Sequence, residues 1–144
     1  MRYIGLDLGT KTLGISLSSS FIATNYKTIR HNEEYDYLAQ EVANLVLEKQ
    51  IDKIVLGFPK NMNNTVGERA EITIKFKEKL EELTKKEVIL EDERLTSKVA
   101  NDVLINADMS RKKRKKRVDG VASVIILQSY LDRKGNENGR EKYN

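Results

Sequence analysis

Acidic side chains stand at three places in the chain where a carboxylate needs a chemical explanation. Asp7 interrupts an apolar stretch that breaks into Gly9-Thr10-Lys11, and the pair Asp92-Glu93 directly follows a second apolar stretch. Asp119 opens a third apolar segment. Burying an unpaired carboxylate is costly, so such groups are normally paired, hydrogen-bonded or bound to a metal. A metal or phosphate site is therefore the first hypothesis.

These residues have the right chemistry for hard divalent cations. The chain lacks cysteine, and its single histidine, His31, has no partner histidine, so we assign it no role. Oxygen ligands alone select Mg²⁺ or Mn²⁺ over zinc. If the fold brings Asp7, the Asp92-Glu93 pair and Asp119 together, cations between them would relieve their mutual repulsion. Two such ions about 3.5–4 Å apart activate water and stabilise the leaving oxygen in phosphodiester hydrolysis, which indicates a nuclease.

Each carboxylate also has a purely structural interpretation. Asp7 could accept hydrogen bonds from backbone amides near Gly9, and Asp119 could stand in a first helical turn because the helix dipole favours acids there. Glu93 beside Arg94 could be a solvated charge pair, which contributes little to stability. The joint occurrence of the acidic positions in one frame of motifs favours the shared metal site.

A block of seven consecutive cationic residues ends two positions before Asp119: Arg111, Lys112, Lys113, Arg114, Lys115, Lys116 and Arg117. Repulsion between like charges keeps such a block open, and a phosphate backbone is its obvious counter-surface. Lys11, Lys60 and Arg94 are further candidates for phosphate contacts. With no tryptophan and few aromatic residues near the block, sequence preference should be weak. The alternative is a solvated basic loop without function.

Composition indicates one intracellular domain. The chain has 144 residues, 26 Lys plus Arg and 22 Asp plus Glu, which give a net charge of +4. The absence of cysteine suits a reducing compartment and favours the cytoplasm. No stretch approaches the apolar length of a membrane span, so we expect no membrane partner. We expect one domain over residues 1–134 and a polar, disordered tail over residues 135–144.

Hydrophobic patterning predicts the elements that must position these groups. We expect strands over residues 2–8, 12–18, 22–29, 54–58 and 88–90, the first three as an antiparallel meander and the last two parallel. Amphipathic spacing predicts helices over residues 33–50 and 67–85, a third from Thr96, and a last one over residues 118–132. The result is an α/β fold with a five-stranded mixed sheet flanked by helices. The carboxylates converge if the first and fifth strands are neighbours.

Four motifs in this frame resemble the YqgF/RuvX family of pre-16S rRNA nucleases. The motifs are Gly5-Leu6-Asp7-Leu8-Gly9-Thr10-Lys11, Gly57-Phe58-Pro59-Lys60-Asn61-Met62, Asp92-Glu93-Arg94-Leu95-Thr96 and Asp119-Gly120-Val121-Ala122-Ser123-Val124-Ile125-Ile126-Leu127-Gln128-Ser129-Tyr130-Leu131. The resemblance spans roughly residues 1–132 and implies an RNase H-like fold of the Holliday-junction resolvase type.

The resemblance also implies the roles of the acidic residues. It places catalytic, metal-binding carboxylates at Asp7, at the Asp92-Glu93 pair and at Asp119. Within the pair we favour Glu93, with Asp92 as the alternative, because neighbouring strand residues face opposite ways. Two departures from the family pattern are Asn63-Asn64 in a loop and Ser123 where alanine is expected, and Ser123 is small enough to keep close packing.

The function implied by the resemblance is a metal-dependent nuclease, a hydrolase of phosphodiester bonds, that processes the 5′ end of pre-16S rRNA in ribosome biogenesis. Alternatives are a resolvase of branched DNA and a non-catalytic RNA-binding factor in ribosome assembly. The first motif also resembles the phosphate-binding hairpin of actin-like and sugar-kinase ATPases, but those proteins need two such domains. We expect a nucleic-acid partner, precursor rRNA first, and a monomer or weak dimer.

Overall fold

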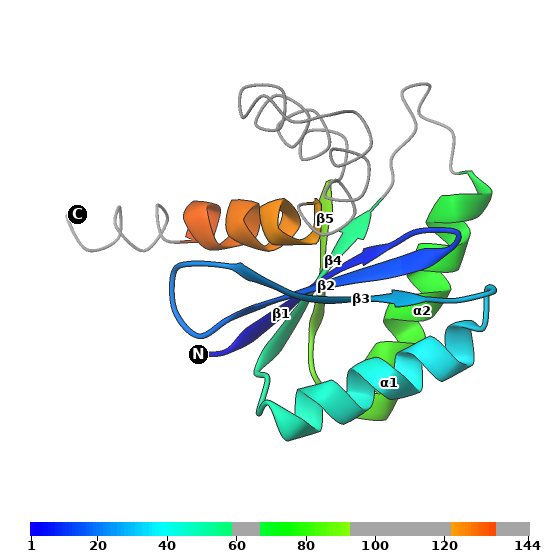
Figure 1. The fold of residues 1–144 in the computed structure, drawn as a ribbon, viewed down its shortest axis with the longest axis horizontal. Coiled ribbons are helices and arrows are strands. Elements are labelled where there is room, and N and C mark those ends of the chain that lie inside the picture. The colour runs from blue at the N-terminus through cyan, green and yellow to red at the C-terminus, as the bar shows by residue number, and fades with distance from the viewer. Residues whose placement is uncertain (59–66, 93–121, 135–144) are drawn as a thin grey trace.

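A five-stranded mixed sheet organises the computed structural model, which describes residues 1–58, 67–92 and 122–134 (Figure 1). The elements are β1 (Tyr3–Leu8), β2 (Thr12–Ser18), β3 (Thr24–Arg30), α1 (Tyr35–Glu48), β4 (Lys53–Phe58), α2 (Glu68–Thr84) and β5 (Val88–Asp92), followed by a helix over residues 122–134. The strand order is β3-β2-β1-β4-β5. The meander β1–β3 is antiparallel, and β4 and β5 pair in parallel, as predicted.

The strand order corrects one condition of the sequence argument. β4 lies between β1 and β5, so the first and fifth strands are not neighbours. Neighbouring strands are about 4.8 Å apart, which puts β1 and β5 about 10 Å apart across the sheet. Carboxylates at the C-terminal ends of these two parallel strands therefore lie at the same end of the sheet, but they are not on adjacent strands.

One face of the sheet packs on α1 and α2. Alternate residues of the central strand, Ile4, Leu6 and Leu8, are buried there. Both helices turn an apolar stripe toward these strands, because helical residues three or four apart share a face. The stripe of α1 comprises Leu38, Ala39, Val42, Leu45 and Val46, and the buried residues of α2 are Ala70, Thr73, Phe76 and Leu80.

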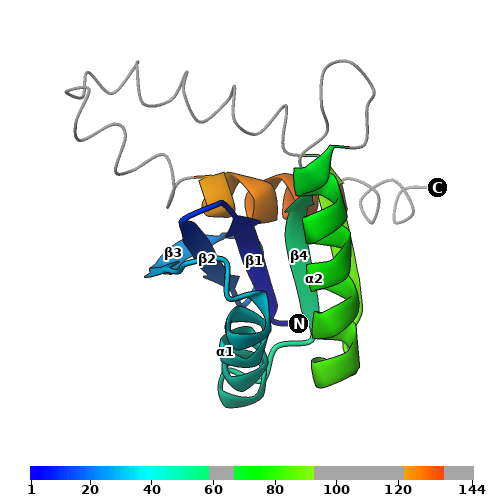
Figure 2. The same cartoon turned by 90° about the vertical axis from the view of Figure 1, so that its right-hand side faces the viewer.

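The helix over residues 122–134 covers the other face (Figures 1 and 2). It packs so closely on β1 that a Cβ at Gly5 would lie 2.7 Å from Leu127 Cβ and 3.1 Å from Ser123 O. Ser123 is fully buried, and Ser16 Oγ of β2 donates to its carbonyl at 2.8 Å. The helix and the sheet are thus in close contact at Ser123, whereas Asp119 lies outside the described residues.

Among the strands, the third and the fifth differ most from the prediction. The third strand begins at Thr24, because Gln128 fixes the preceding residues in a connection: its amide accepts from Ala23 N at 2.8 Å and donates to Phe21 O at 2.7 Å. The fifth strand continues past residue 90 to Asp92, so Glu91 and Asp92 are strand residues. The last helix runs two residues beyond the predicted end at 132.

Several predictions concern residues that the structure does not describe. The helix from Thr96, residues 118–121 of the last helix and the tail over residues 135–144 lie outside the described residues. Within the described segments, no helix is long and apolar enough to cross a membrane.

Candidate active site

Asp7 is the penultimate residue of β1 and is half-buried. Ile4, Leu6 and Leu8 face the α1–α2 layer, so strand alternation puts Asp7 on the opposite face, the one that carries the helix over residues 122–134. We call this the Asp7 face.

The strands beside Asp7 place no side chain next to it on this face. Gly14 of β2 pairs directly with Asp7. On the other side, Leu6 pairs with Leu56 of β4, and continuing this parallel register by one residue puts Gly57 level with Asp7. A carboxylate between two glycines of its own sheet has lateral room that any larger pair of residues would fill.

Asp92, the first residue of the predicted Asp92-Glu93 pair, lies on the face of the sheet opposite Asp7. Glu91 faces the helix over residues 122–134, because its carboxylate binds Arg133 of that helix. Alternation therefore puts Asp92 on the α1–α2 side, away from Asp7. Of the acidic positions predicted from the sequence, Glu93 and Asp119 lie outside the described residues.

Most of the cationic residues predicted to contact phosphates also lie outside the residues that the structure describes. Lys11 is exposed in the turn after β1, three residues beyond Leu8, the last residue of the strand that carries Asp7. Lys60, Arg94 and the basic block over residues 111–117 lie outside the described segments. Within residues 1–58, 67–92 and 122–134, no group of three or more acidic or histidine side chains is placed to hold a metal ion.

His31, to which the sequence assigned no role, braces the turn beyond Asp7. It is 8% exposed, and its Nε2 donates to Gly9 O at 3.0 Å while Nδ1 accepts from Glu33 N at 3.0 Å. We assign the Nε2-protonated neutral tautomer from these two partners. His31 N also donates to Lys11 O at 2.9 Å. The turn is thus tied at two carbonyls to the residue that follows β3.

Arg69 holds the end of β1 from the other side. Its Nη2 donates to Leu8 O at 2.9 Å, and its Nη1 donates to the Tyr35 hydroxyl at 3.4 Å. The Tyr35 ring lies 5.9 Å from the His31 ring. A cation near the start of α2 opposes the helix dipole, which is the local signal that could have identified Arg69 in the sequence. Together, His31, Tyr35 and Arg69 fix the backbone on the carboxyl side of Asp7.

An acidic residue that the sequence analysis did not identify lies level with Asp7 on the same face. Glu91 pairs with Gly57 in the sheet, and its side chain is 5% exposed. Arg133 forms a fork with it, Nη1 to Oε1 at 2.6 Å and Nη2 to Oε2 at 2.7 Å. Charge-assisted bidentate pairs are among the stronger hydrogen-bonded contacts. The fork ties the end of β5 to the helix over residues 122–134, and the sequence distance between the partners concealed it.

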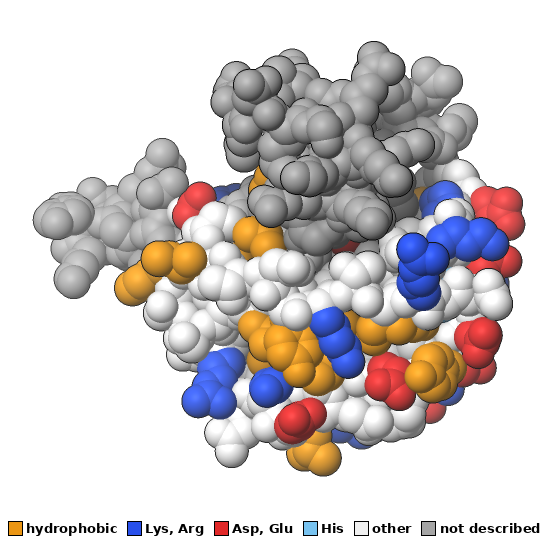
Figure 3. Space-filling model, viewed as in Figure 1, with side chains coloured by type: hydrophobic (Ala, Val, Ile, Leu, Met, Phe, Trp, Pro, Cys, Tyr) orange, Lys and Arg blue, Asp and Glu red, His pale blue; other side chains and the backbone are white. Residues whose placement is uncertain are grey.

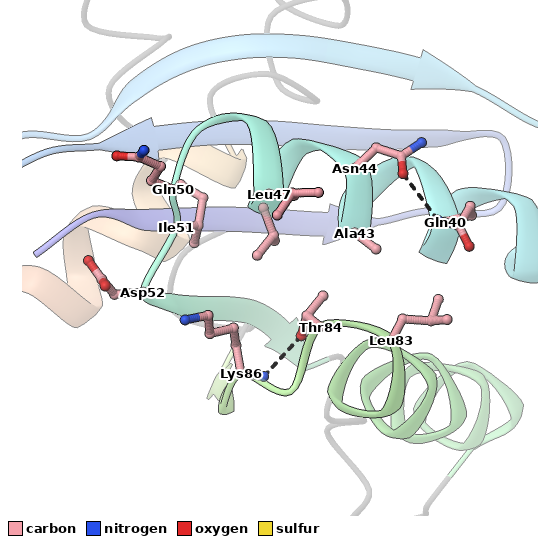
Figure 4. A pocket seen from close by; sticks show the side chains of 11 residues that line it. Gln40, Ala43, Asn44, Leu47, Gln50, Ile51, Asp52, Leu83, Thr84 and Lys86 are labelled. Carbon is pink, nitrogen blue, oxygen red and sulfur yellow. Dashed lines mark hydrogen bonds between the residues drawn. The ribbon is translucent and has the colours of Figure 1, made fainter.

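A pocket of about 400 Å³ lies elsewhere, between α1 and the C-terminal end of α2 (Figure 4). Its lining includes Leu47, Leu83 and Ile51, together with amide groups such as Asn44. Ile51 precedes β4, whereas Asp7 is at the far end of the parallel strand β1. The pocket is thus at the opposite end of the sheet and is separate from the candidate site.

Known proteins match this chain in sequence over most of its length. A family model described as RuvX: Holliday junction resolvase matches residues 1–133. A Bacillus subtilis protein named "Putative pre-16S rRNA nuclease" is 53% identical over 135 residues, 92% of this chain and 98% of that protein. A Bacillus cytotoxicus protein of the same name is 50% identical over 137 residues, 93% of this chain and all of that protein (100%).

A solved structure shares the fold at low sequence identity. T. thermophilus RuvC in complex with Holliday junction substrate has a TM-score of 0.60 at 11% identity, and the match covers 94% of this chain and 96% of that one. The predicted RNase H-like fold is therefore confirmed.

Proposed function

Because the chain belongs to the RuvX family of Holliday junction resolvases, we propose that it is a metal-dependent nuclease that hydrolyses phosphodiester bonds. The observation that carries the proposal is the setting of Asp7. A half-buried carboxylate at a strand end, flanked by two glycines and followed by a braced turn, is suited to binding a ligand.

The carboxylates of the proposed site fit a hard divalent cation. Asp7, Glu93 and Asp119 would hold Mg²⁺ or Mn²⁺, which would supply an activated water and stabilise the leaving oxygen. Strand alternation supports Glu93 over Asp92, because Asp92 lies on the face opposite Asp7.

The surrounding residues keep the Asp7 carboxylate in a fixed position. His31 and Arg69 hold the carbonyls of Gly9 and Leu8, so the backbone beside Asp7 is restrained on both sides of the turn. Catalysis depends on such preorganisation, since misplacement by about 1 Å costs on the order of 100-fold in rate.

The names of the relatives support precursor 16S rRNA as the substrate, and we propose processing of its 5′ end. Lys11, Lys60, Arg94 and the basic block over residues 111–117 would contact phosphates. The description of the family model favours one second candidate, resolution of branched DNA. Both substrates require the same carboxylates.

The decisive experiment compares cleavage of end-labelled precursor rRNA and of a four-way DNA junction, each with Mg²⁺, Mn²⁺ or EDTA. Asp7→Asn should abolish metal-dependent cleavage without unfolding the protein. Asp36→Asn, which removes an exposed carboxylate in the first turn of α1, is the matched control and should cleave normally. Cleavage by pure Asp7→Asn protein would refute the assignment. Cutting of the junction alone would replace RNA processing by resolution.

A further inference from the structure

The segment that follows Asp7 has an unusual charge distribution. Between Asp7 and Glu33 the chain has no acidic residue, whereas Lys11, Lys27 and Arg30 are cationic. The same segment is rich in serine and threonine, whose hydroxyls bind phosphate oxygens. The chain has 22 acidic residues in all, so this acid-free ribbon is a local feature and does not follow from the overall composition.

β3 presents this ribbon at the edge of the sheet. Every residue of the strand is exposed except Ile29, which is half-buried, and β3 pairs on one side only. Cationic side chains blunt such an edge against pairing with another strand. The same cations make it a surface for a polyanion. Figure 3 shows blue Lys and Arg side chains around an orange apolar cluster on this side of the molecule, with red acidic side chains below and to the right of it.

The sheet register connects β3 to Asp7. Asp7 pairs with Gly14, and Gly14 pairs with Thr28 of β3, so Thr28 is level with Asp7 on the same face. Arg30 pairs with Thr12 and lies one step further toward the turn, also on the Asp7 face. β3 is two strand spacings from β1, about 10 Å. A nucleic-acid strand passing over Asp7 would therefore bring its next phosphates within reach of Thr28 and Arg30.

Lys27 and the neighbouring Tyr26 lie toward the other face of this edge strand, because Lys27 pairs with Ile15, which is buried under α1 and α2. Tyr26 lies at the register shift of β3 and is 38% exposed. Its ring has Lys27 Nζ at 5.9 Å and Lys49 Nζ at 5.4 Å from the centroid. An exposed ring beside ammonium groups is the arrangement that stacks a base while its phosphates are neutralised.

We propose that the exposed edge strand β3 binds a single-stranded RNA segment next to the cleavage position. Arg30 would contact a phosphate at the Asp7 face, and Lys27 and Tyr26 would contact the next phosphate and base at the opposite face of the strand. The inference rests on the proposed nuclease function and adds to it the strandedness of the substrate and its course over the protein. A duplex keeps its bases stacked on one another, so only a single strand can use Tyr26.

Binding of a fluorescent single-stranded RNA, measured by anisotropy over a range of salt concentrations, tests the proposal in an Asp7→Asn background that prevents cleavage. Lys27→Gln/Arg30→Gln should make the fall of log affinity with log salt less steep by about 1.4, since each phosphate contact on a single strand contributes about 0.7. Tyr26→Leu should weaken binding by about five-fold or more with an unchanged slope, and should leave duplex RNA binding unaltered.

The matched control is Lys75→Gln/Lys79→Gln on α2, which removes the same charge far from β3. It should leave the slope unchanged. An unchanged slope for Lys27→Gln/Arg30→Gln, or an equal loss in the control, would overturn the proposal. These results are independent of the nuclease assignment, which fails only if metal-dependent cleavage survives Asp7→Asn or never occurs in the wild type.

Discussion

Replacing Gly5 by alanine tests how closely the helix over residues 122–134 must approach β1. The new Cβ would overlap Ser16 Oγ and would lie 2.7 Å from Leu127 Cβ, whereas ordinary contacts are 3.4–4 Å. Two responses are available: the helix moves away by several tenths of an ångström, or Ser16 rotates. Rotation breaks the bond from Ser16 Oγ to Ser123 O, which is buried.

The expected cost combines these two effects. Overpacking of a filled core costs about 1–3 kcal/mol. A buried hydroxyl that loses its acceptor costs about 1–3 kcal/mol more. Alanine recovers about 0.5 kcal/mol by restricting the unfolded chain. We therefore expect Gly5→Ala to lower the free energy of unfolding by about 1.5–5.5 kcal/mol, with reduced cleavage because the helix shifts relative to the strand that carries Asp7.

Urea unfolding followed by circular dichroism measures this cost in Gly5→Ala, Ser16→Ala and the double variant. Ser16→Ala removes the oxygen that overlaps the new Cβ, so the double variant should be less destabilised than the sum of the single changes. Coupling between residues in contact is typically about 0.5–3 kcal/mol. A loss below about 0.5 kcal/mol in Gly5→Ala, or strict additivity, would refute the close-packing argument.

Three further predictions concern groups that fix the sheet and its helices. His31→Ala should lower the free energy of unfolding by about 1–3 kcal/mol, because Gly9 O loses its donor, and should raise the Mg²⁺ concentration for half-maximal cleavage; an unaltered Mg²⁺ titration would leave His31 a purely structural role. Arg133→Ala should cost about 2–4 kcal/mol in urea unfolding, since it leaves the buried Glu91 carboxylate without its fork, and equal loss in Lys134→Ala would contradict this. The hydrogen bond from Lys77 lowers the pKa of Glu81 below its ordinary 4.5, so Glu81 stabilises the fold above that pH and the contribution is lost as the pH falls through the lowered pKa. Glu81→Gln should therefore be less stable than wild type by under about 1 kcal/mol at neutral pH, given the exposure of the pair, and the difference should disappear as the pH falls through that lowered pKa; a difference that persisted below it would exclude the ion pair as its cause.

Local patterning predicted the order and type of the described elements because each one, except the exposed edge strand β3, buries an apolar stripe or an alternating set. It failed where contacts between distant residues determine the start of a strand or the order of strands in the sheet. The third strand starts late because Gln128, more than 100 residues away, binds the preceding backbone. The insertion of β4 between β1 and β5 likewise follows from parallel pairing between distant segments, which no local spacing encodes.

The candidate site was predicted in part. The resemblance and the strand pattern singled out Asp7, and the structure puts it at a strand end with glycines on both sides. The groups around it were missed: His31 is 22 residues from Gly9, and Arg69 is 61 residues from Leu8. Their partners are backbone carbonyls, which have no sequence signature. Glu91 was missed because the fifth strand was predicted to end at residue 90.

The contact between Ser16 and Ser123 has a consequence for how the protein is made. The two residues are 107 positions apart, so the first strand leaves the ribosome long before the helix that covers it. At about 5–20 residues per second, the delay is on the order of ten seconds. Until then Tyr3 and Val55, which pack in one apolar cluster with residues of that helix, are not covered by it. The nascent chain therefore exposes this face of the sheet until residues 122–134 have left the ribosome.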